Sequence, residues 1–256
     1  MRTAKVTNFP ELSYACAEAI NTLCTNLTFA GNGIKRIMIT SCHASEGKST
    51  ISMNVLRTMA SLGKRVCLLD MDLRRSLIVQ TYGIRFDGGD PKGSSHYLAG
   101  QVGGDDVLYE LDIPGAYIVP VTKRVSSSLS LLNSNRLQEL IQSLGDYYDY
   151  VIVDAPPIGA LIDAAQIARF CDGTLLVINY NEVRKKELMD AKAQLDQTGC
   201  PILGTVINQA RFDSYVDRKY YYKSYYYTHY DHYYTADQAG KPAESKTKKS
   251  LIGKKK

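Results

Sequence analysis

The 256-residue sequence has no tryptophan, only four histidines and no long hydrophobic run. None of its apolar stretches approaches the roughly 20 residues that a helix needs to cross a bilayer. The first 13 residues also lack the apolar segment of a secretory signal. These absences lead us to expect neither an integral membrane protein nor an exported one.

The cysteines are few and scattered, and no two of them form a CxxC pair. They are Cys16, Cys24, Cys42, Cys67, Cys171 and Cys200. Together with the scarcity of histidine, this spacing argues against a structural zinc site. It fits a reducing, cytoplasmic environment.

Charged residues and tyrosines are unevenly distributed along the chain. The net charge is +5, but residues 239–256 hold seven Lys and one Glu, which leaves the rest of the chain at −1. A nearly neutral body does not favour nucleic-acid binding, so we expect no nucleic-acid partner. Of the 19 tyrosines, nine fall within residues 220–234.

Apolar runs that suit buried strands alternate with amphipathic runs that suit helices. We expect strands at residues 36–40, 66–69, 117–121, 150–153, 174–178 and 202–207, with helices at 49–62 and 182–198. This alternation predicts an α/β fold with a parallel sheet covered by helices on both faces. The Gly- and Asp-rich stretch Gly83–Gly104 is expected to be a long loop with a short helix.

A phosphate-binding loop is predicted between the first of these strands and the first helix. The segment Gly47-Lys48-Ser49-Thr50 is the second half of a Walker A motif, although Cys42 replaces the leading glycine. Lys48 is expected to reach the β- and γ-phosphates, and the Ser49 hydroxyl to ligate Mg²⁺. The backbone N–H groups of residues 45–49, including Ser45 and Glu46, are expected to surround the β-phosphate. An ordinary strand-to-helix turn is the alternative.

Three aspartates follow two of the predicted strands. Asp70 and Asp72 end the second strand, and Asp154 ends the fourth. The carboxyl ends of parallel strands gather ligands, so we expect these acids to hold Mg²⁺ and orient a nucleophile. The alternative is that they cap helices.

The motifs together resemble the bacterial tyrosine kinases of capsule and exopolysaccharide synthesis. The resemblance rests on SEGKST, DMDLRR and VDAPP, with support from YLAG at Tyr97–Gly100, IDAA at Ile162–Ala165 and the tyrosine cluster. It implies a P-loop NTPase-like three-layer sandwich with a central, mostly parallel sheet and helices on both faces. It also implies protein-tyrosine kinase activity that uses ATP and Mg²⁺.

The resemblance also implies roles for individual residues. Lys48, Asp70, Asp72 and Arg74 would be catalytic, with Asp72 orienting the tyrosine hydroxyl. Ser49, Asp70 and Asp154 would hold Mg²⁺, directly or through water. The nucleotide would contact Ser45, Glu46, Gly47, Lys48, Ser49 and Thr50, with Asn208 near the adenine. Arg74 or Arg75 would stabilise the transferring group or contact a neighbouring subunit.

Two positions depart from related patterns. Septum-site and plasmid-partitioning ATPases carry a signature Lys where this chain has His43, which favours the kinase. The kinases often use an E-x-x-R-x-x-R motif to form rings, whereas this chain has Glu18, Asn21 and Cys24. The ring contacts therefore cannot be carried over.

The tyrosine cluster would be the autophosphorylation substrate. Its members are Tyr220, Tyr221, Tyr222, Tyr225, Tyr226, Tyr227, Tyr230, Tyr233 and Tyr234. The alternative is a stacking surface for RNA or single-stranded DNA. We expect an N-terminal helical segment at 1–30, a kinase domain at 31–210, the tyrosine-rich segment at 211–236 and a disordered Lys-rich tail at 237–256.

The resemblance further implies partners and a location. These are a membrane-anchored activator that controls polysaccharide chain length, other copies of the same chain and a protein-tyrosine phosphatase. The chain would then lie in the cytoplasm, peripheral to the inner face of the membrane. A partitioning-type ATPase switch and a catalytically silent scaffold are alternatives, and phosphotyrosine formation would separate them from a kinase.

Overall fold

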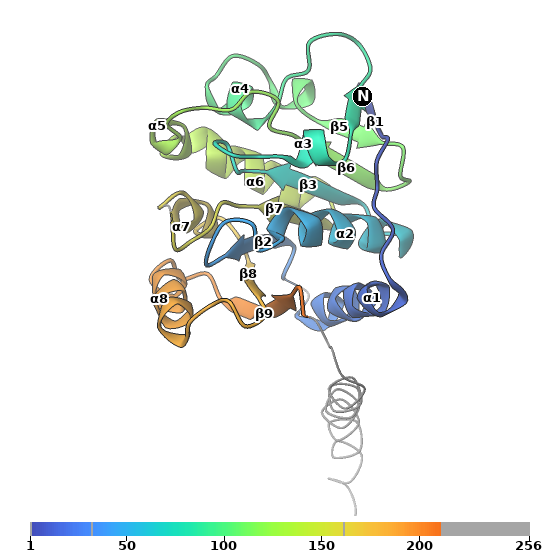
Figure 1. The fold of residues 1–256 in the computed structure, drawn as a ribbon. Coiled ribbons are helices and arrows are strands. Elements are labelled where there is room, and N and C mark those ends of the chain that lie inside the picture. Colours follow the sequence, from blue (N-terminus) through green and yellow to red (C-terminus); the bar gives the residue numbers. More distant parts are fainter. Residues whose placement is uncertain (1, 32, 161, 211–256) are drawn as a thin grey trace, which may run out of the picture. The chain divides into compact units, whose positions relative to one another are not determined.

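The computed structural model describes residues 2–31, 33–160 and 162–210, which contain a nine-stranded sheet with helices on both faces (Figure 1). These described residues all belong to one unit of the chain, Met1–Ala210. None of the described helices is long and apolar enough to span a bilayer. The expected tyrosine-rich segment and Lys-rich tail lie outside the described residues.

The strand order is β4-β1-β5-β6-β3-β7-β2-β8-β9. The strands are β1 (Arg2–Val6), β2 (Arg36–Ser41), β3 (Val66–Asp70), β4 (Ile84–Phe86), β5 (Tyr109–Leu111), β6 (Ala116–Val119), β7 (Tyr150–Asp154), β8 (Gly173–Asn179) and β9 (Ile202–Asn208). The six from β6 to β9 in this order run parallel to one another. The sheet reverses direction between β6 and β5 and again between β1 and β4. The predicted mostly parallel α/β fold is confirmed.

Helices cover the sheet on both sides. They are α1 (Tyr14–Phe29), α2 (Lys48–Ser61), α3 (Ile78–Thr81), α4 (Ser94–Leu98), α5 (Leu129–Leu132), α6 (Asn135–Tyr147), α7 (Asp163–Ala168) and α8 (Lys185–Asp196). One core packs α1, α2 and α3 on the sheet through residues such as Leu56 and Met59. The other packs α6, α7 and α8 through residues such as Ile141, Ile167 and Leu195. The alternating strands therefore bury both of their faces.

All six predicted strands and both predicted helices are present. The fit is closest for four strands that extend the predictions by one residue: Arg36–Ser41, Val66–Asp70, Tyr150–Asp154 and Ile202–Asn208. The strand predicted at 117–121 ends earlier, at Val119, because Pro120 follows it and has no N–H to donate. The helix predicted at 182–198 is shorter, since it begins at Lys185.

The edge of the sheet formed by β4, β1 and β5 was not predicted. Within Gly83–Gly104 the expected short helix is α4, but residues Ile84–Phe86 are a strand instead of loop. Likewise the N-terminal segment contains α1 and also the strand β1. These strands are three to five residues long and have weak periodicity, so pairing with distant segments decides their conformation.

Candidate active site

The phosphate loop connects β2 to α2 and has a strained backbone. Ser45 and Gly47 both adopt left-handed conformations, with φ of 66° and 87°. A Cβ at Gly47 would lie 2.1 Å from Nδ2 of Asn208 at the end of β9. Glycine is therefore required at this position by both its conformation and its neighbour. The turn leaves the first N–H groups of α2 free to bind an anion, as the Walker motif predicts.

The Glu46 carboxylate holds this loop to the sheet. Glu46 is 2% exposed. One carboxylate oxygen accepts a hydrogen bond from the His43 N–H at 2.6 Å, and the other accepts one from the Asn179 N–H at 3.2 Å. Asn208 Nδ2 donates to the Glu46 carbonyl at 2.9 Å. The sequence predicted Glu46 as a backbone ligand only, so this side-chain role and that of Asn179 were missed.

Lys48 and Ser49 begin α2 and face Asp154. The Ser49 hydroxyl donates to Asp154 at 2.6 Å, and the Ser52 hydroxyl donates to the other carboxylate oxygen at 2.9 Å. Lys48 is 7% exposed, and its positive charge favours the ionised form of Asp154. The structure thus brings together the predicted loop lysine, hydroxyl ligand and strand-end acid. Ser52 was not predicted, although it lies one turn after Lys48 on the same helix face.

Asp70 lies beside Asp154, because the two are register partners at the ends of β3 and β7. Both carboxyl groups are fully buried. Burial raises the pKa of Asp154 to about 6, against the opposing effects of Lys48 and its two serine partners. Burial, followed by the charge of Asp154, raises the pKa of Asp70 well above its usual range. Two buried acids side by side are a functional-site signature, since a protein gains no stability from them.

The third predicted acid lies in the turn that follows β3. One carboxylate oxygen of Asp72 accepts from the Arg75 N–H at 2.9 Å, and its own N–H donates to Asp70 at 3.3 Å. Asp72 is only half-buried, so it is the member of the acid group that solvent reaches. Arg74 Nη2 donates to the Ser126 carbonyl at 3.0 Å.

Two further polar residues support the site and were not predicted. The Ser76 hydroxyl donates a short hydrogen bond to Asp70. Tyr82 is buried in the core that packs α2 on the sheet, and burial raises the pKa of its hydroxyl. No periodic or motif signal marks either residue, because both reach the site through the tertiary fold.

The position of the missing Walker glycine is occupied by a buried thiol. Burial, followed by the charges of Glu46 and Glu187, raises the pKa of Cys42 to about 11. The thiol is therefore protonated and unreactive at neutral pH. The neighbouring His43 is exposed, and its Nε2 lies 3.4 Å from the Glu187 carboxylate.

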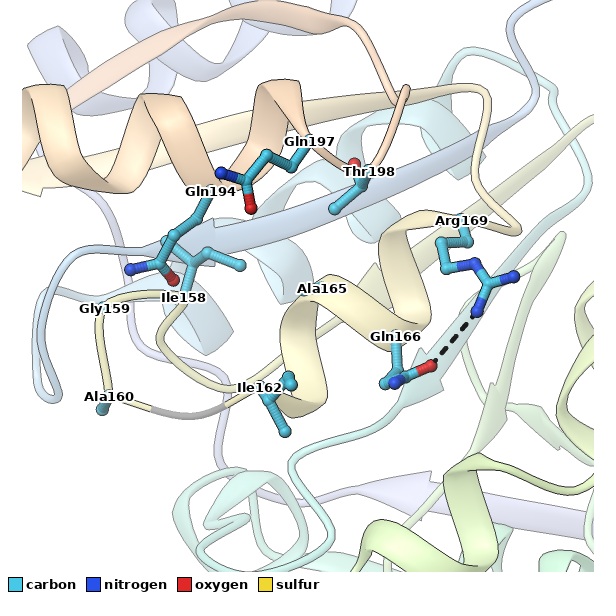
Figure 2. A pocket seen from close by; sticks show the side chains of 10 residues that line it. All are labelled: Ile158, Gly159, Ala160, Ile162, Ala165, Gln166, Arg169, Gln194, Gln197 and Thr198. Atoms are coloured by element: carbon cyan, nitrogen blue, oxygen red, sulfur yellow. Dashed lines mark hydrogen bonds between the residues drawn. The ribbon is translucent and has the colours of Figure 1, made fainter.

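A groove of about 520 Å³ lies between α7 and α8, apart from these residues (Figure 2). Ile158 and Ile162 contribute apolar side chains to its lining. Gln166 lies on α7 and Arg169 directly follows it, and Arg169 Nη1 donates to Gln166 Oε1 at 3.5 Å. It contains none of the predicted nucleotide, metal or catalytic residues. The chemistry therefore belongs to the carboxyl ends of the strands and not to this groove.

Comparison with known proteins identifies the family. Residues 34–188 match a family model described as an AAA domain. The chain is 34% identical over 192 residues to the tyrosine-protein kinase CpsD of Streptococcus agalactiae serotype III (strain NEM316), an alignment that covers 75% of this chain and 82% of CpsD.

Solved structures show the same likeness. The kinase domain of the Escherichia coli tyrosine kinase ETK aligns with a TM-score of 0.69 and 29% identity, over 77% of this chain and 78% of that one. The septum site-determining protein MinD of Pyrococcus horikoshii OT3, solved with Mg-ADP, shares the fold at a TM-score of 0.59 and 23% identity, over 70% and 72% of the two chains. The chain belongs to the nucleotide-binding bacterial tyrosine kinases of capsular and exopolysaccharide synthesis, whose kinase domain derives from a P-loop ATPase.

Proposed function

We propose that this kinase transfers the γ-phosphoryl group of ATP to the tyrosine cluster of another copy of itself and so regulates capsule assembly or export. The observation that supports this most strongly is Asp154, which contacts Ser49 and Ser52 and lies beside Asp70 and near Lys48. The nine tyrosines of residues 220–234 lie outside the described residues and are assigned from the sequence alone.

The site suits a hard divalent cation such as Mg²⁺. Ser49, Asp70 and Asp154 supply hydroxyl and carboxylate oxygens, which are the ligands that Mg²⁺ prefers. No three His, Cys, Asp or Glu side chains within 2–31, 33–160 and 162–210 converge to hold a metal by themselves. That agrees with Mg²⁺, which keeps waters and takes substrate phosphates as further ligands. When bound, the cation would neutralise charge on the β- and γ-phosphates.

The residues have separate tasks in the transfer. Lys48 and the loop N–H groups would hold the phosphates, and the half-buried Asp72 would orient the tyrosine hydroxyl. The tyrosine oxygen forms a bond to the γ-phosphorus as the bond from that phosphorus to the β,γ-bridging oxygen breaks. ADP leaves with the bond's electron pair, and the phenolic proton passes to Asp72 or to water. This assignment needs positioning and charge neutralisation more than a strong base.

Partners and location follow from the resemblance. A membrane-anchored activator of polysaccharide chain-length control would recruit the chain to the inner face of the membrane, and a protein-tyrosine phosphatase would reverse the modification. The Lys-rich residues 239–256 carry +6 and support such a location, because a lysine near an anionic leaflet contributes about 1 kcal/mol.

The test is to incubate the full chain with ATP and Mg²⁺ and map phosphate by mass spectrometry. We expect phosphotyrosine within residues 215–234, with a rate per molecule that rises with protein concentration because the reaction occurs in trans. A matched variant with all ten tyrosines of residues 215–234 changed to Phe should lose that signal and still phosphorylate a synthetic tyrosine peptide. Phosphate only elsewhere in the chain would contradict the proposal, as would a concentration-independent rate.

A further inference from the structure

Four basic side chains lie on two loops at the carboxyl end of the sheet and take no part in the roles assigned above to Lys48 and the acids. Arg74, Arg75, Lys123 and Arg124 are here called the basic rim. Arg75, Lys123 and Arg124 are exposed, and Arg74 is half-buried. None of the four pairs with a carboxylate within 4.0 Å in the described part of the chain. A group of cations without acidic partners is suited to bind an anion from outside.

Hydrogen bonds hold the two loops together. The Val125 N–H donates to the Leu73 carbonyl at 3.0 Å, and the Ser95 hydroxyl donates to the Lys123 carbonyl at 2.7 Å. Arg74 Nη2 donates across the loops to the Ser126 carbonyl at 3.0 Å. The backbone of both loops is therefore held in place before a ligand binds, so binding has mainly the rim side chains to order.

Arg124 connects the rim directly to the acid group. Its Nε and Nη2 donate to the Ser76 carbonyl at 3.0 and 2.7 Å, and the hydroxyl of the same Ser76 donates to Asp70. One residue thus separates the guanidinium from a predicted metal ligand. Two of the five N–H donors of Arg124 are used in these contacts, so three are left for an incoming group.

The charge of the proposed substrate segment changes during the reaction. Residues 215–234 contain Arg218, Lys219 and Lys223 against Asp217 and Asp231, so the unmodified segment carries +1. Each phosphotyrosine adds about −1.5 to −2. The rim should therefore repel the unmodified segment and attract the same segment once a single tyrosine has been phosphorylated.

We propose that the basic rim is a recognition site for phosphotyrosine, which holds an already modified segment while a neighbouring tyrosine enters the site. Arginine binds phosphate oxygens in bidentate fashion, and charge-assisted hydrogen bonds of this kind are about twice as strong as neutral ones. The first phosphorylation of a segment is then slow, and later ones are faster. This inference rests on the proposed function, since it names the preferred form of that substrate.

The test measures binding without turnover. Fluorescent peptides of residues 215–234, unmodified or phosphorylated at Tyr222, are titrated with the dephosphorylated full chain in Mg²⁺ and a non-hydrolysable ATP analogue. We expect the phosphopeptide to bind about tenfold more tightly, and the difference to shrink with added salt. Equal affinity for the two peptides would overturn the proposal.

Matched charge reversals locate the effect. Lys123→Glu should reduce the preference for the phosphopeptide by about three- to tenfold, because it reverses one charge of the rim. The variant should fold normally, since no described side-chain contact depends on this lysine. Lys64→Glu makes the same charge change on an exposed residue at the other end of β3 and should leave the preference unchanged. Arg124→Gln is the second rim variant, with a thermal melt to report on the Ser76 contact. Equal losses for Lys123→Glu and Lys64→Glu would contradict the rim.

Failure of this inference is distinguishable from failure of the proposed function. The binding assay needs no phosphoryl transfer, so it gives an answer even for a chain that does not modify its own cluster. Conversely, mass spectrometry can find phosphate within residues 215–234 while the two peptides bind equally, which would overturn only the rim.

Discussion

The amino and carboxyl ends of the parallel strands differ in how their charged side chains are partnered. At the amino ends, Asp172 accepts hydrogen bonds from the Arg36 side chain and from two backbone N–H groups, and Asp149 accepts one from the Arg65 N–H. At the carboxyl ends, Asp70 and Asp154 are buried side by side, and the basic rim lies near them without acidic partners among the described residues.

The difference separates stability from function within one sheet. Hydrogen bonds from Arg36 lower the pKa of Asp172 although burial opposes them, so the ionised form is favoured in the fold. Burial raises the pKa of Asp154 to about 6, so the fold favours its protonated form more than the unfolded chain does. The ion pair at the amino ends stabilises the fold, whereas the buried acids at the carboxyl ends lower its stability and are suited to binding.

The largest expected effect is at the phosphate loop. Lys48→Met should reduce phosphotyrosine formation by at least about a hundredfold, since it removes the only ammonium predicted to reach the transferring group. Full activity in a phosphotyrosine blot of this variant would reject the site. A thermal melt with a native-like midpoint is the control for folding.

The matched pair Asp154→Asn and Asp172→Asn tests the comparison directly. Asp154→Asn should lose activity by about a hundredfold or more while keeping or raising the melting temperature at pH 8, because it removes a strained buried charge. Asp172→Asn should keep its activity and lose roughly 1–2 kcal/mol of unfolding free energy, because it weakens the Arg36 contacts. The comparison is wrong if Asp154→Asn is the less stable of the two.

The pH dependence of stability should have opposite signs at the two ends. The pKa of Asp154 is raised in the folded chain, whereas in the unfolded chain it is near 3.9. The folded chain therefore binds a proton at this carboxyl more tightly than the unfolded chain does. Without nucleotide, the wild type should therefore lose stability relative to Asp154→Asn as pH rises from about 4 to about 6. The pKa of Asp172 is lowered, so the wild type's advantage over Asp172→Asn should be present above about pH 4 and lost below it. Thermal melts of the three proteins, in buffers that cover both pH windows, measure the two effects. Two stability differences that change with pH in the same direction would contradict the assignment.

The smallest expected effect is at the carboxylate that holds the loop. Glu46→Gln replaces one accepting oxygen by a donor, so the loop loses its bond from either His43 or Asn179. We expect nucleotide affinity to fall about three- to tenfold, measured by titration with a fluorescent ADP. Glu187→Gln, which alters the exposed partner of His43, is the control and should change affinity by less than about twofold. Similar losses in both variants would mean that Glu46 has no special role.

Particular residues show how far the sequence alone was informative. Lys48, Ser49, Asp70 and Asp154 were predicted as a group and do lie together, because their motif spacing encodes a strand end and a helix start. Helix α6 was not predicted, although Leu137, Leu140, Ile141 and Leu144 recur at helical spacing, so a signal was available. Ser76, Asn179 and the carboxylate of Glu46 carried no such signal, since their partners are remote or belong to loop backbone.

The sequence by itself determined the parallel core, the phosphate loop, the acids at the strand ends and the family. These depend on local patterns: the alternation of apolar runs, the glycine and lysine that precede a helix, and carboxylates that end buried strands. Only the tertiary structure decided that β4, β1 and β5 complete the sheet and that the loop with Lys123 and Arg124 packs against the loop that follows β3. Both outcomes depend on contacts between segments far apart in the chain, and no local pattern carries the energy of such contacts.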